Sequence, residues 1–262
     1  MNKTKIPWAD YTWNPITGCS AISEGCKNCY AEAVSKRFGW KWGEPQFHPE
    51  RLDEPGKVKK SSKIFVCSMS DLFHGSNKPE WIRRILCEII DNPQHTFIIL
   101  TKRPRIMKEF FLKNSWFDGV KNQSVPINNL WLGVTVENQK RVNERIPVLC
   151  DIPAKVRFVS AEPLLEDINL NLCHECQANP EECREHNKIN WVIAGGETGP
   201  SARYCDPDWI MRIKENVPEN RFFFKQWGTN KETKKKTGLI NRVSLYRERM
   251  EETENERNFP EV

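Results

Sequence analysis

Short apolar segments recur along the chain, and a polar cluster follows each of them. Strands that are apolar at nearly every position are typical of a parallel sheet covered on both faces. Helical patterns fill several of the gaps, most clearly between Pro79 and Pro93. The alternation therefore predicts βαβ units built around a parallel sheet. The predicted strand segments are 63–71, 95–104, 130–138, 156–163, 190–199 and 221–228.

The same alternation predicts the remaining elements. An earlier strand is expected at 10–15, further helices are expected at 30–38, 103–113, 138–149 and 206–216, and a long loop is expected at 39–62. The predicted fold class is α/β: a partial or complete TIM-type (β/α) barrel of about six to seven parallel strands. The spacing alone does not separate a barrel from an open doubly wound sheet.

The domain organisation follows from where this pattern is interrupted. One barrel domain is expected at 1–228, with a Cys/His-rich insertion at 169–190, and a charged tail of weak helical character is expected at 229–262. The sequence contains no run of 18 or more apolar residues, so no transmembrane helix is predicted. The first residues lack the apolar core of a secretory signal. We therefore expect a cytoplasmic protein with no membrane partner.

Charge and cysteine content narrow the chemistry. The net charge of +5 permits an anionic substrate or nucleic acid without requiring one. Ten cysteines without a secretory signal indicate a reducing compartment, where clustered thiols bind metal or do redox work more often than they form disulfides. Four isolated cysteines are expected to be buried as small hydrophobic residues: Cys67, Cys87, Cys150 and Cys205.

The most specific motif is TGCSAISEGCKNCYAE, in which Cys19, Cys26 and Cys29 have the spacing C-x6-C-x2-C. Thiolates are soft ligands that select zinc, copper(I) or iron–sulfur clusters. A structural zinc needs a fourth ligand, which His48 or His74 could supply. A four-iron cluster held by three cysteines instead leaves one iron open to a small molecule such as S-adenosylmethionine. The position after the first strand favours the cluster, because barrels carry their active sites at strand ends.

The polar clusters that follow the strands are the candidates for cofactor and substrate binding. Ligands of parallel α/β folds bind at the carboxyl ends of strands, so we expect these clusters to converge on one rim. For any single cluster, strand-end capping or ion pairing is as good an interpretation, and Glu162, Glu137 and Lys102 could pair with one another. The candidates are Ser68, Ser70, Asp71, Lys102, Arg103, Thr135, Glu137, Ser160, Glu162, Gly195, Gly196, Glu197, Lys225 and Gln226.

A second cysteine cluster lies in the insertion. Cys173, Cys176, Cys183 and His186 have the spacing C-x2-C-x6-C-x2-H, in which two ligand pairs flank a short loop. This spacing suits a tetrahedral zinc that staples the insertion. His174 could replace His186, and both a second iron–sulfur cluster and an insertion without metal remain open.

Several stretches together carry a family resemblance. They are TWNPITGCSAISEGCKNCYAE, RLDEP, FVCSMSDLFH, HTFIILTKRP, LWLGVTVENQ, ERIPVL, VRFVSAEPLL, WVIAGGETGP and FFFKQWG, and they span about residues 8–228. On these motifs the chain resembles the phage-associated three-cysteine-motif family, an uncharacterised group that in turn resembles the radical-SAM superfamily. The resemblance implies a partial TIM-type barrel, a 4Fe-4S cluster on the three N-terminal cysteines, S-adenosylmethionine, an electron donor and a separate partner protein.

The chain departs from mainstream radical-SAM sequences in its cysteine spacing. Their commonest motif has three residues between the first two cysteines, whereas six stand here, and many carry an aromatic residue where this chain has Asn28. The resemblance therefore transfers the cluster to Cys19, Cys26 and Cys29, but it does not transfer the individual contacts with S-adenosylmethionine.

Two functional hypotheses result. In the first, the protein is a radical-SAM-like enzyme that cleaves S-adenosylmethionine reductively to a 5′-deoxyadenosyl radical, which acts on an unknown substrate; nucleic acid or a nucleotide is the suggested class. In the second, it is an accessory protein that binds nucleic acid and is stabilised by zinc or an iron–sulfur cluster. The basic balance, the segment KETKKK and ten tryptophans permit the second.

Overall fold

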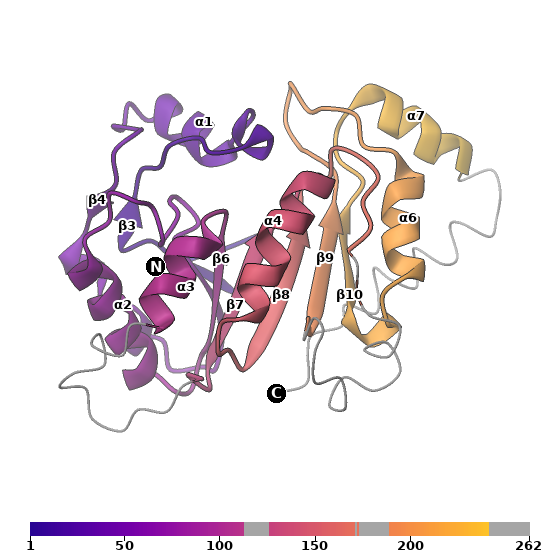
Figure 1. Ribbon diagram of the computed structural model, residues 1–262. Helices are drawn as coiled ribbons and strands as arrows, with labels where there is room; N and C mark the ends of the chain where they lie inside the picture. Colours follow the sequence, from indigo (N-terminus) through magenta and orange to yellow (C-terminus); the bar gives the residue numbers. More distant parts are fainter. Residues whose placement is uncertain (113–125, 171, 173–188, 241–262) are drawn as a thin grey trace. The chain divides into compact units, whose positions relative to one another are not determined.

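The computed structural model describes residues 1–112, 126–170, 172 and 189–240 (Figure 1). The chain divides into two compact units. Unit 1 comprises Met1–Val134 and Asp151–Arg157, and unit 2 comprises Thr135–Cys150 and the chain from Phe158 onward. Each unit contains parallel strands and helices, so each is described by itself.

The strands of unit 1 follow the order β1-β2-β5-β6-β7. The strands from β2 to β7 are parallel, whereas the short β1 is antiparallel at the edge. A small antiparallel pair, β3 (Ile16–Thr17) and β4 (Gln46–Phe47), stands apart from them. Strand formation near 10–15, 63–71, 95–104 and 130–138 is thereby confirmed. The bounds are β1 (Asn2–Lys3), β2 (Tyr11–Trp13), β5 (Lys63–Val66), β6 (Thr96–Thr101) and β7 (Leu130–Thr135, whose last residue belongs to unit 2).

The helices of unit 1 are α1 (Tyr30–Arg37), α2 (Pro79–Asp91) and α3 (Pro104–Leu112), all close to their expected positions. Helix α2 begins at a proline and buries one apolar face, which includes Ile85 and Ile89. The segment 39–62, expected as a loop, contains β4 and short 3₁₀ turns at Pro49–Arg51 and Pro55–Lys57. In Figure 1, α1 lies at the upper end of the unit, above β3.

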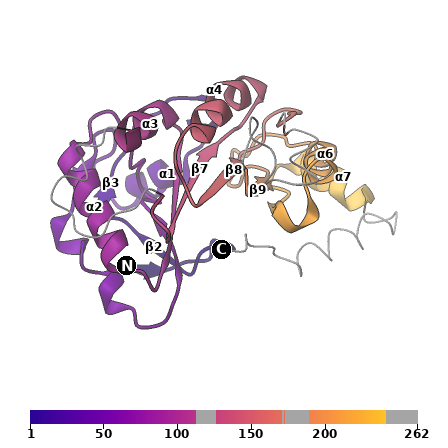
Figure 2. The same cartoon turned by 60° about the horizontal axis from the view of Figure 1, so that its bottom comes forward.

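The strands of unit 2 follow the order β8-β9-β10, and both pairs are parallel. They are β8 (Val156–Ala161, which begins in unit 1), β9 (Trp191–Gly195) and β10 (Phe222–Gln226), which confirms the three later strand predictions. The helices are α4 (Gln139–Cys150), α6 (Pro207–Glu215) and α7 (Lys231–Ile240). Helix α7 lies beside α6 in both views (Figures 1 and 2) and falls in the expected tail, whose boundary at 228 stays a prediction.

The α/β class with parallel strands is therefore confirmed in both units. In the part of the chain that the structure describes, the strand order of each unit is open, which agrees with a partial barrel and gives no support to a complete one. The described residues contain no helix that is both long enough and apolar enough to cross a membrane.

Large aromatic residues fill the core of each unit. Trp13 packs against Phe97 in unit 1 at 5.9 Å between ring centroids, and Trp191 packs against Phe158 and Phe223 in unit 2 at 5.5 and 5.6 Å. Burying side chains of this size stabilises the fold by about 2–3 kcal/mol each.

The four isolated cysteines divide into two pairs. Cys67 and Cys205 are buried as expected, and burial raises the pKa of each thiol to about 12. The prediction is wrong for Cys87 and Cys150, which are half-buried. A single cysteine on an amphipathic helix stands near the border of its apolar face, and the sequence pattern does not resolve on which side of that border it falls.

Candidate functional site

The loop that carries Cys19, Cys26 and Cys29 is tied to the chain that follows β5. Strand β5 ends at Val66 because Cys67 has a φ of 58°, a left-handed conformation that no strand continues. The side-chain oxygen of Asn14 accepts hydrogen bonds from the Met69 backbone N–H (2.9 Å) and the Ser68 hydroxyl (3.2 Å). The end of the first strand and the turn at 67–70 therefore form one hydrogen-bonded platform.

Gly18 joins this platform immediately before the first cysteine. Its N–H donates to the Met69 carbonyl at 3.0 Å, and its carbonyl accepts from the Ser70 hydroxyl at 2.6 Å. Its φ is +88°, and a Cβ at this position would lie 2.3 Å from the Glu44 carbonyl oxygen. A glycine is therefore required here both by its backbone conformation and by the close approach of another segment.

The three thiols are free and half-buried. Cys26 ends a 3₁₀ turn (Glu24–Cys26), and Cys29 precedes α1, accepting a backbone hydrogen bond from Ala33 at 3.1 Å. The hydroxyl of Tyr30, the first residue of α1, donates to the Ser68 carbonyl. Both ends of the cysteine loop are thus anchored to the platform at the carboxyl end of β5.

Arg103 lies beneath this loop and contacts the first cysteine directly. Its Nη1 donates to Asp71 Oδ2 at 3.0 Å and to Cys19 Sγ at 3.7 Å, while its Nη2 donates to the Ser20 carbonyl at 2.9 Å. The side chains of Arg103 and Asp71 are each only 8% exposed. A buried ion pair therefore lies against a sulfur atom.

Asp71 is held from several sides. Its carboxylate accepts hydrogen bonds from the Thr101 hydroxyl (2.7 Å), the Lys102 backbone N–H (3.1 Å) and the Phe73 backbone N–H (3.0 Å), besides the guanidinium of Arg103. The ends of β5 and β6 therefore bring Ser68, Ser70, Asp71, Lys102 and Arg103 together with the cysteine loop, as expected for neighbouring parallel strands.

Neighbouring groups have opposite effects on the pKa of the Cys19 thiol. Burial and the carboxylate of Asp71 raise the pKa of the Cys19 thiol, and together they outweigh the lowering by Arg103. The Cys26 thiol raises it further. A positive ligand beside Cys19 would reverse this balance, because a bound metal favours the thiolate.

Two histidines, His48 and His74, form hydrogen bonds with hydroxyl groups near the first cysteine. His74 Nε2 lies 2.7 Å from the Ser20 hydroxyl, and its Nδ1 accepts from the Ser76 N–H, so Nε2 carries the proton in the neutral ring. Burial and then Arg103 lower the pKa of His74. His48 Nε2 lies 2.8 Å from the Thr17 hydroxyl, and burial and then Arg51 lower its pKa. Both histidines are therefore favoured in the neutral form.

The donor set fits a cluster in kind and number. Three free cysteines on one loop match the thiolate ligands of a four-iron cluster with one open iron. Among the described residues, no group of three or more His, Cys, Asp or Glu side chains is arranged to hold one metal ion.

In unit 2, Glu162 joins two residues at the end of β10. Its carboxylate accepts from Lys225 Nζ at 2.7 Å and from Gln226 Nε2 at 3.0 Å. All three groups are half-buried. These three predicted site residues therefore form one polar cluster.

Glu137 lies in a second cluster of unit 2. Its carboxylate is fully buried and accepts from Arg145 Nη1 at 2.8 Å, and the same Nη1 donates to the Thr135 carbonyl at 2.7 Å. The buried Ser160 accepts at its carbonyl from the Val136 N–H. Glu137 and Glu162 are each ion-paired, as the alternative interpretation allows, and their partners are Arg145 and Lys225.

The Gly-Gly-Glu stretch after β9 packs against the chain's own backbone. A Cβ on Gly196 would lie 2.1 Å from the Trp227 carbonyl oxygen, and one on Gly195 would lie 3.2 Å from that of Gln226. Glu197 accepts from the Arg203 guanidinium at 2.9 and 2.6 Å. The close backbone approach that these glycines permit is therefore made within the protein.

The residues that the sequence does not single out are mainly partners of those that it does. Asn14 follows a short strand and is not distinguished from it, while Thr101 is assigned only to its strand. Arg145 lies on α4 eight residues after Glu137, a separation that no local pairing rule for helices identifies. Convergence of strand ends from both units on one rim stays a prediction, and Cys173, Cys176, Cys183 and His186 lie outside the described residues.

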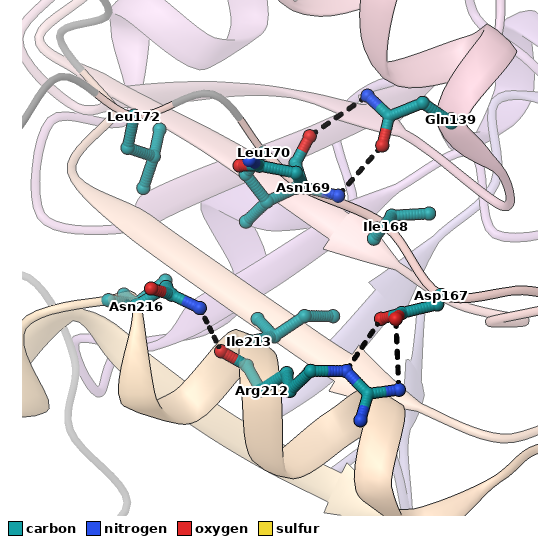
Figure 3. Close-up of a pocket in the computed structure, with 10 residues that line it drawn as sticks. Gln139, Asp167, Ile168, Asn169, Leu170, Leu172, Arg212, Ile213 and Asn216 are labelled. Atoms are coloured by element: carbon teal, nitrogen blue, oxygen red, sulfur yellow. Dashed lines mark hydrogen bonds and ion pairs between the residues drawn. The ribbon is translucent and has the colours of Figure 1, made fainter.

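Unit 2 also contains a pocket of about 680 Å³. Gln139 and Asn169 are joined on its wall by paired hydrogen bonds of 2.9 and 2.7 Å, and Arg212 pairs with Asp167 (Figure 3). None of its lining residues belongs to the predicted site. The polar groups drawn in Figure 3 are largely used by one another, so the pocket does not identify a ligand.

Comparison with known proteins identifies solved structures of similar fold and a family to which the sequence matches. The chain is similar in fold to a mutant of spore photoproduct lyase, with a TM-score of 0.52 and 10% identity over 87% of this chain and 79% of that one. Another mutant of that lyase, with bound AdoMet and dinucleoside spore photoproduct, aligns at a TM-score of 0.46 and 11% identity over 89% of this chain and 61% of that one.

One curated relative is an uncharacterized protein of Methanocaldococcus jannaschii, 32% identical over 114 residues. The match covers 43% of this chain and 42% of that protein, so the shared segment is less than half of either. The family described as "Protein of unknown function (DUF5131)" matches residues 3–259, and the chain therefore belongs to it.

Proposed function

We propose that the protein is a radical-SAM-like enzyme whose 4Fe-4S cluster is held by Cys19, Cys26 and Cys29. The observation that carries the proposal is a loop of three free, half-buried thiols, anchored at both ends to the carboxyl end of a parallel strand. A cofactor at this edge of the sheet lies where α/β folds bind their ligands. The similarity in fold to spore photoproduct lyase supports the architecture.

When bound, a cluster with an open iron supplies an electron to S-adenosylmethionine, whose cleavage gives a 5′-deoxyadenosyl radical. The chain's own contribution is to fix the loop. The Ser70 hydroxyl holds its start at the Gly18 carbonyl, and the Ser68 carbonyl holds its end through Tyr30, so both ends of the loop are fixed. The half-buried side chain of Lys102 is the proposed partner for the carboxylate of the methionine group.

We further propose a role in binding for the polar cluster of unit 2. Glu162, Lys225 and Gln226 offer one carboxylate, one ammonium and one amide that are all partly exposed to solvent. Such a set suits the hydroxyl and amino groups of a nucleoside. In contrast, we propose that the buried Glu137 and the ion-paired Glu197 have a structural role and do not contact the ligand.

Nucleic acid is the proposed substrate class. Phe38 and Trp40, at the end of α1, stack on each other at 5.2 Å and are 59% and 53% exposed. Lys36, Arg37 and Lys41 stand next to them in the sequence and are exposed as well. Exposed aromatic faces among cations suit unstacked bases and their phosphates.

The test of the proposed function is anaerobic purification and reconstitution with iron and sulfide. We expect a brown protein that releases 5′-deoxyadenosine from S-adenosylmethionine under strong reductant. Replacing all three loop cysteines by alanine should remove both the colour and the product, whereas Cys87→Ala, which changes a half-buried thiol on α2, should leave both unchanged. A wild-type protein that takes up no iron would refute the proposal.

The alternative is an accessory protein that binds nucleic acid and uses its metal only structurally. The exposed pair of Phe38 and Trp40 favours it as much as it favours a nucleic-acid enzyme. A colourless zinc protein with salt-dependent nucleic-acid binding is the outcome that identifies it. An electron donor, a separate partner protein and an association with phages belong to the enzyme proposal and follow from the family resemblance alone.

Zinc is proposed for the second cysteine cluster. Metal analysis of Cys173→Ala and Cys183→Ala proteins should show that zinc is lost relative to the wild type. Unchanged zinc content in both variants would exclude these residues as its ligands.

A further inference from the structure

Arg103 is a candidate for cofactor or substrate binding by its place at a strand end, but its donors are already engaged within the protein. Nη1 is shared between Asp71 Oδ2 and Cys19 Sγ, and Nη2 is shared between the carbonyl and the hydroxyl of Ser20. The side chain is 8% exposed. Its donors therefore point at the cysteine loop and at one buried carboxylate, and the residue acts inside the protein.

The contact with Cys19 has a chemical meaning if that sulfur ligates iron. A thiolate ligand carries negative charge, and reduction of the cluster adds more. A guanidinium that donates to this sulfur stabilises the reduced form more than the oxidised form, and hydrogen bonds to sulfur are one of the factors that set cluster potentials. The same low exposure that orders Arg103 also weakens screening by solvent.

Asp71 acts in the opposite direction on the same atom. Its carboxylate binds Nη1, the nitrogen that also reaches Cys19 Sγ, so both charges lie close to the sulfur. Negative charge near a cluster disfavours an added electron. The ion pair is held in this orientation by the Thr101 hydroxyl and by the backbone N–H groups of Phe73 and Lys102, so its geometry does not depend on a ligand.

We propose that Arg103 is a positioning residue that donates a hydrogen bond to the ligand sulfur of Cys19, and that the Asp71–Arg103 pair sets the reduction potential of the cluster. This inference rests on the proposed function, because it requires a cluster on Cys19. It adds a regulation of that site: one member of the pair raises the potential and the other lowers it.

Two variants with opposite expected signs test it. In Arg103→Gln, the loss of charge leaves Asp71 facing the sulfur, and we expect the equilibrium constant for one-electron reduction to fall about tenfold, which corresponds to about 59 mV. In Asp71→Asn, the guanidinium keeps its place without its counter-charge, and we expect a rise of similar size. Arg103→Lys retains the charge but loses the planar fork, so its shift should be smaller than that of Arg103→Gln and in the same direction.

Arg105→Gln is the matched control. Arg105 lies on α3 two residues further along, is exposed, and loses the same charge on substitution. Solvent screens it, so the potential should stay at the wild-type value. All proteins are reconstituted anaerobically, their iron and sulfide are quantified, and the midpoint potential is obtained by redox titration monitored with electron paramagnetic resonance.

The outcomes separate the inference from the proposed function. If the wild-type protein binds no iron, the proposed function fails and the inference fails with it. If the wild type binds a cluster but the Arg103→Gln and Asp71→Asn potentials move in the same direction, or neither differs from Arg105→Gln, the inference is wrong while the cluster stands. Should Arg103→Gln not fold, Asp71→Asn decides, since a potential at or below the wild-type value overturns the inference.

Discussion

Both units place charged residues at the carboxyl ends of their strands, but the charges are used differently. In unit 1, the buried Asp71–Arg103 pair contacts the free thiol of Cys19. In unit 2, the buried carboxylate of Glu137 is paired with Arg145, which also donates to the backbone carbonyl of Thr135. The same sequence pattern, an apolar strand followed by polar residues, thus gives an ion pair in contact with a thiol in one unit and an ion pair in contact with a backbone carbonyl in the other.

The difference shows that a polar strand end is informative only together with its partners. Removing one partner of a fully buried ion pair destabilises the protein mainly because the other charge is left buried and unpaired. A guanidinium that also reaches a sulfur changes the properties of that sulfur. We therefore expect variants of the unit 2 pair to lose stability alone, and variants of the unit 1 region to lose bound metal as well.

The largest expected loss of stability comes from Arg145→Met in unit 2. The change leaves the fully buried Glu137 with the more distant Arg141, whose Nε lies 4.0 Å away. Removing one partner of a buried pair costs about 3–5 kcal/mol. Urea unfolding should show this loss, while the iron bound per folded molecule stays at the wild-type value.

Lys140→Met is the control for that variant, because Lys140 lies exposed on the same helix. Its cost should be about 0–1 kcal/mol. If both variants cost the same, the buried pair does not have the role assigned to it.

Gly18→Ala should lower both the stability and the iron retention of unit 1. A Cβ would lie 2.3 Å from the Glu44 carbonyl oxygen at a φ of +88°, so the loop must shift, at an expected cost of about 2–4 kcal/mol. We expect iron retention to fall with it, because Cys19 follows directly. Iron content per folded molecule and the free energy of unfolding measure the two effects separately.

Gly43→Ala provides the comparison. Gly43 also has a positive φ, +104°, but a Cβ at this position would have nothing within 4 Å of it. Its cost should be limited to backbone strain, about 1–2 kcal/mol. Equal iron loss in the two variants would contradict the assigned role of Gly18 in placing Cys19.

A smaller effect is expected at the start of α6, in unit 2. Asp206 caps this helix through the Asp208 N–H (3.0 Å) and binds Lys236 Nζ at 2.6 Å. Burial opposes ionisation, but the hydrogen bonds from Lys236, the Asp208 N–H and Tyr204 lower the pKa of Asp206. Asp206→Ala should cost about 1–2 kcal/mol at neutral pH.

The pH dependence has a definite sign. A carboxyl whose pKa is lowered in the folded state contributes stability above its unfolded pKa of about 3.9, and this contribution is lost as the pH falls through the folded value. The difference between Asp206→Ala and the wild type should therefore shrink in acid. Asp208→Ala, which also removes a Lys236 contact but not the cap, is the control; a larger cost for it than for Asp206→Ala would contradict the capping assignment.

The smallest effect is expected for Arg212→Gln on the wall of the pocket in Figure 3. Arg212 and Asp167 are about half-exposed, and exposed pairs contribute about 0–1 kcal/mol that added salt removes. Unfolding at low and high salt checks this. A cost well above 1 kcal/mol that persists at high salt would contradict the assignment of Arg212 and Asp167 as a solvent-exposed pair.

Much of the fold can be predicted from the sequence because its signals are local. The apolar run of β6 (Thr96–Thr101) and the helical face of α2 (Pro79–Asp91) need only neighbouring residues to be recognised. Strand ends are predicted less well. The run 63–71 predicts a longer strand than β5, because nothing in the sequence marks Cys67 as the residue that takes a positive φ.

The site can be predicted only as a set of residues, not as contacts. The cysteine loop and the strand-end residues Asp71 and Arg103 are identifiable, since motif spacing and strand ends are sequence features. That Arg103 turns toward Cys19 rather than outward depends on partners 32 and 84 residues away, and several acceptors compete for one guanidinium. Burial selects among them, and burial is a property of the folded chain.

The glycines of unit 2 carry a consequence for evolution and engineering. A Cβ on Gly196 would collide with the Trp227 carbonyl, and one on Gly228 would lie 2.7 Å from the Glu197 carbonyl oxygen, so the turns after β9 and β10 are mutually fitted. Neither turn can gain side chains or length without the other yielding. Homologues should therefore vary at these two turns together, and a loop graft into this protein must exchange 195–199 and 226–229 as a single cassette.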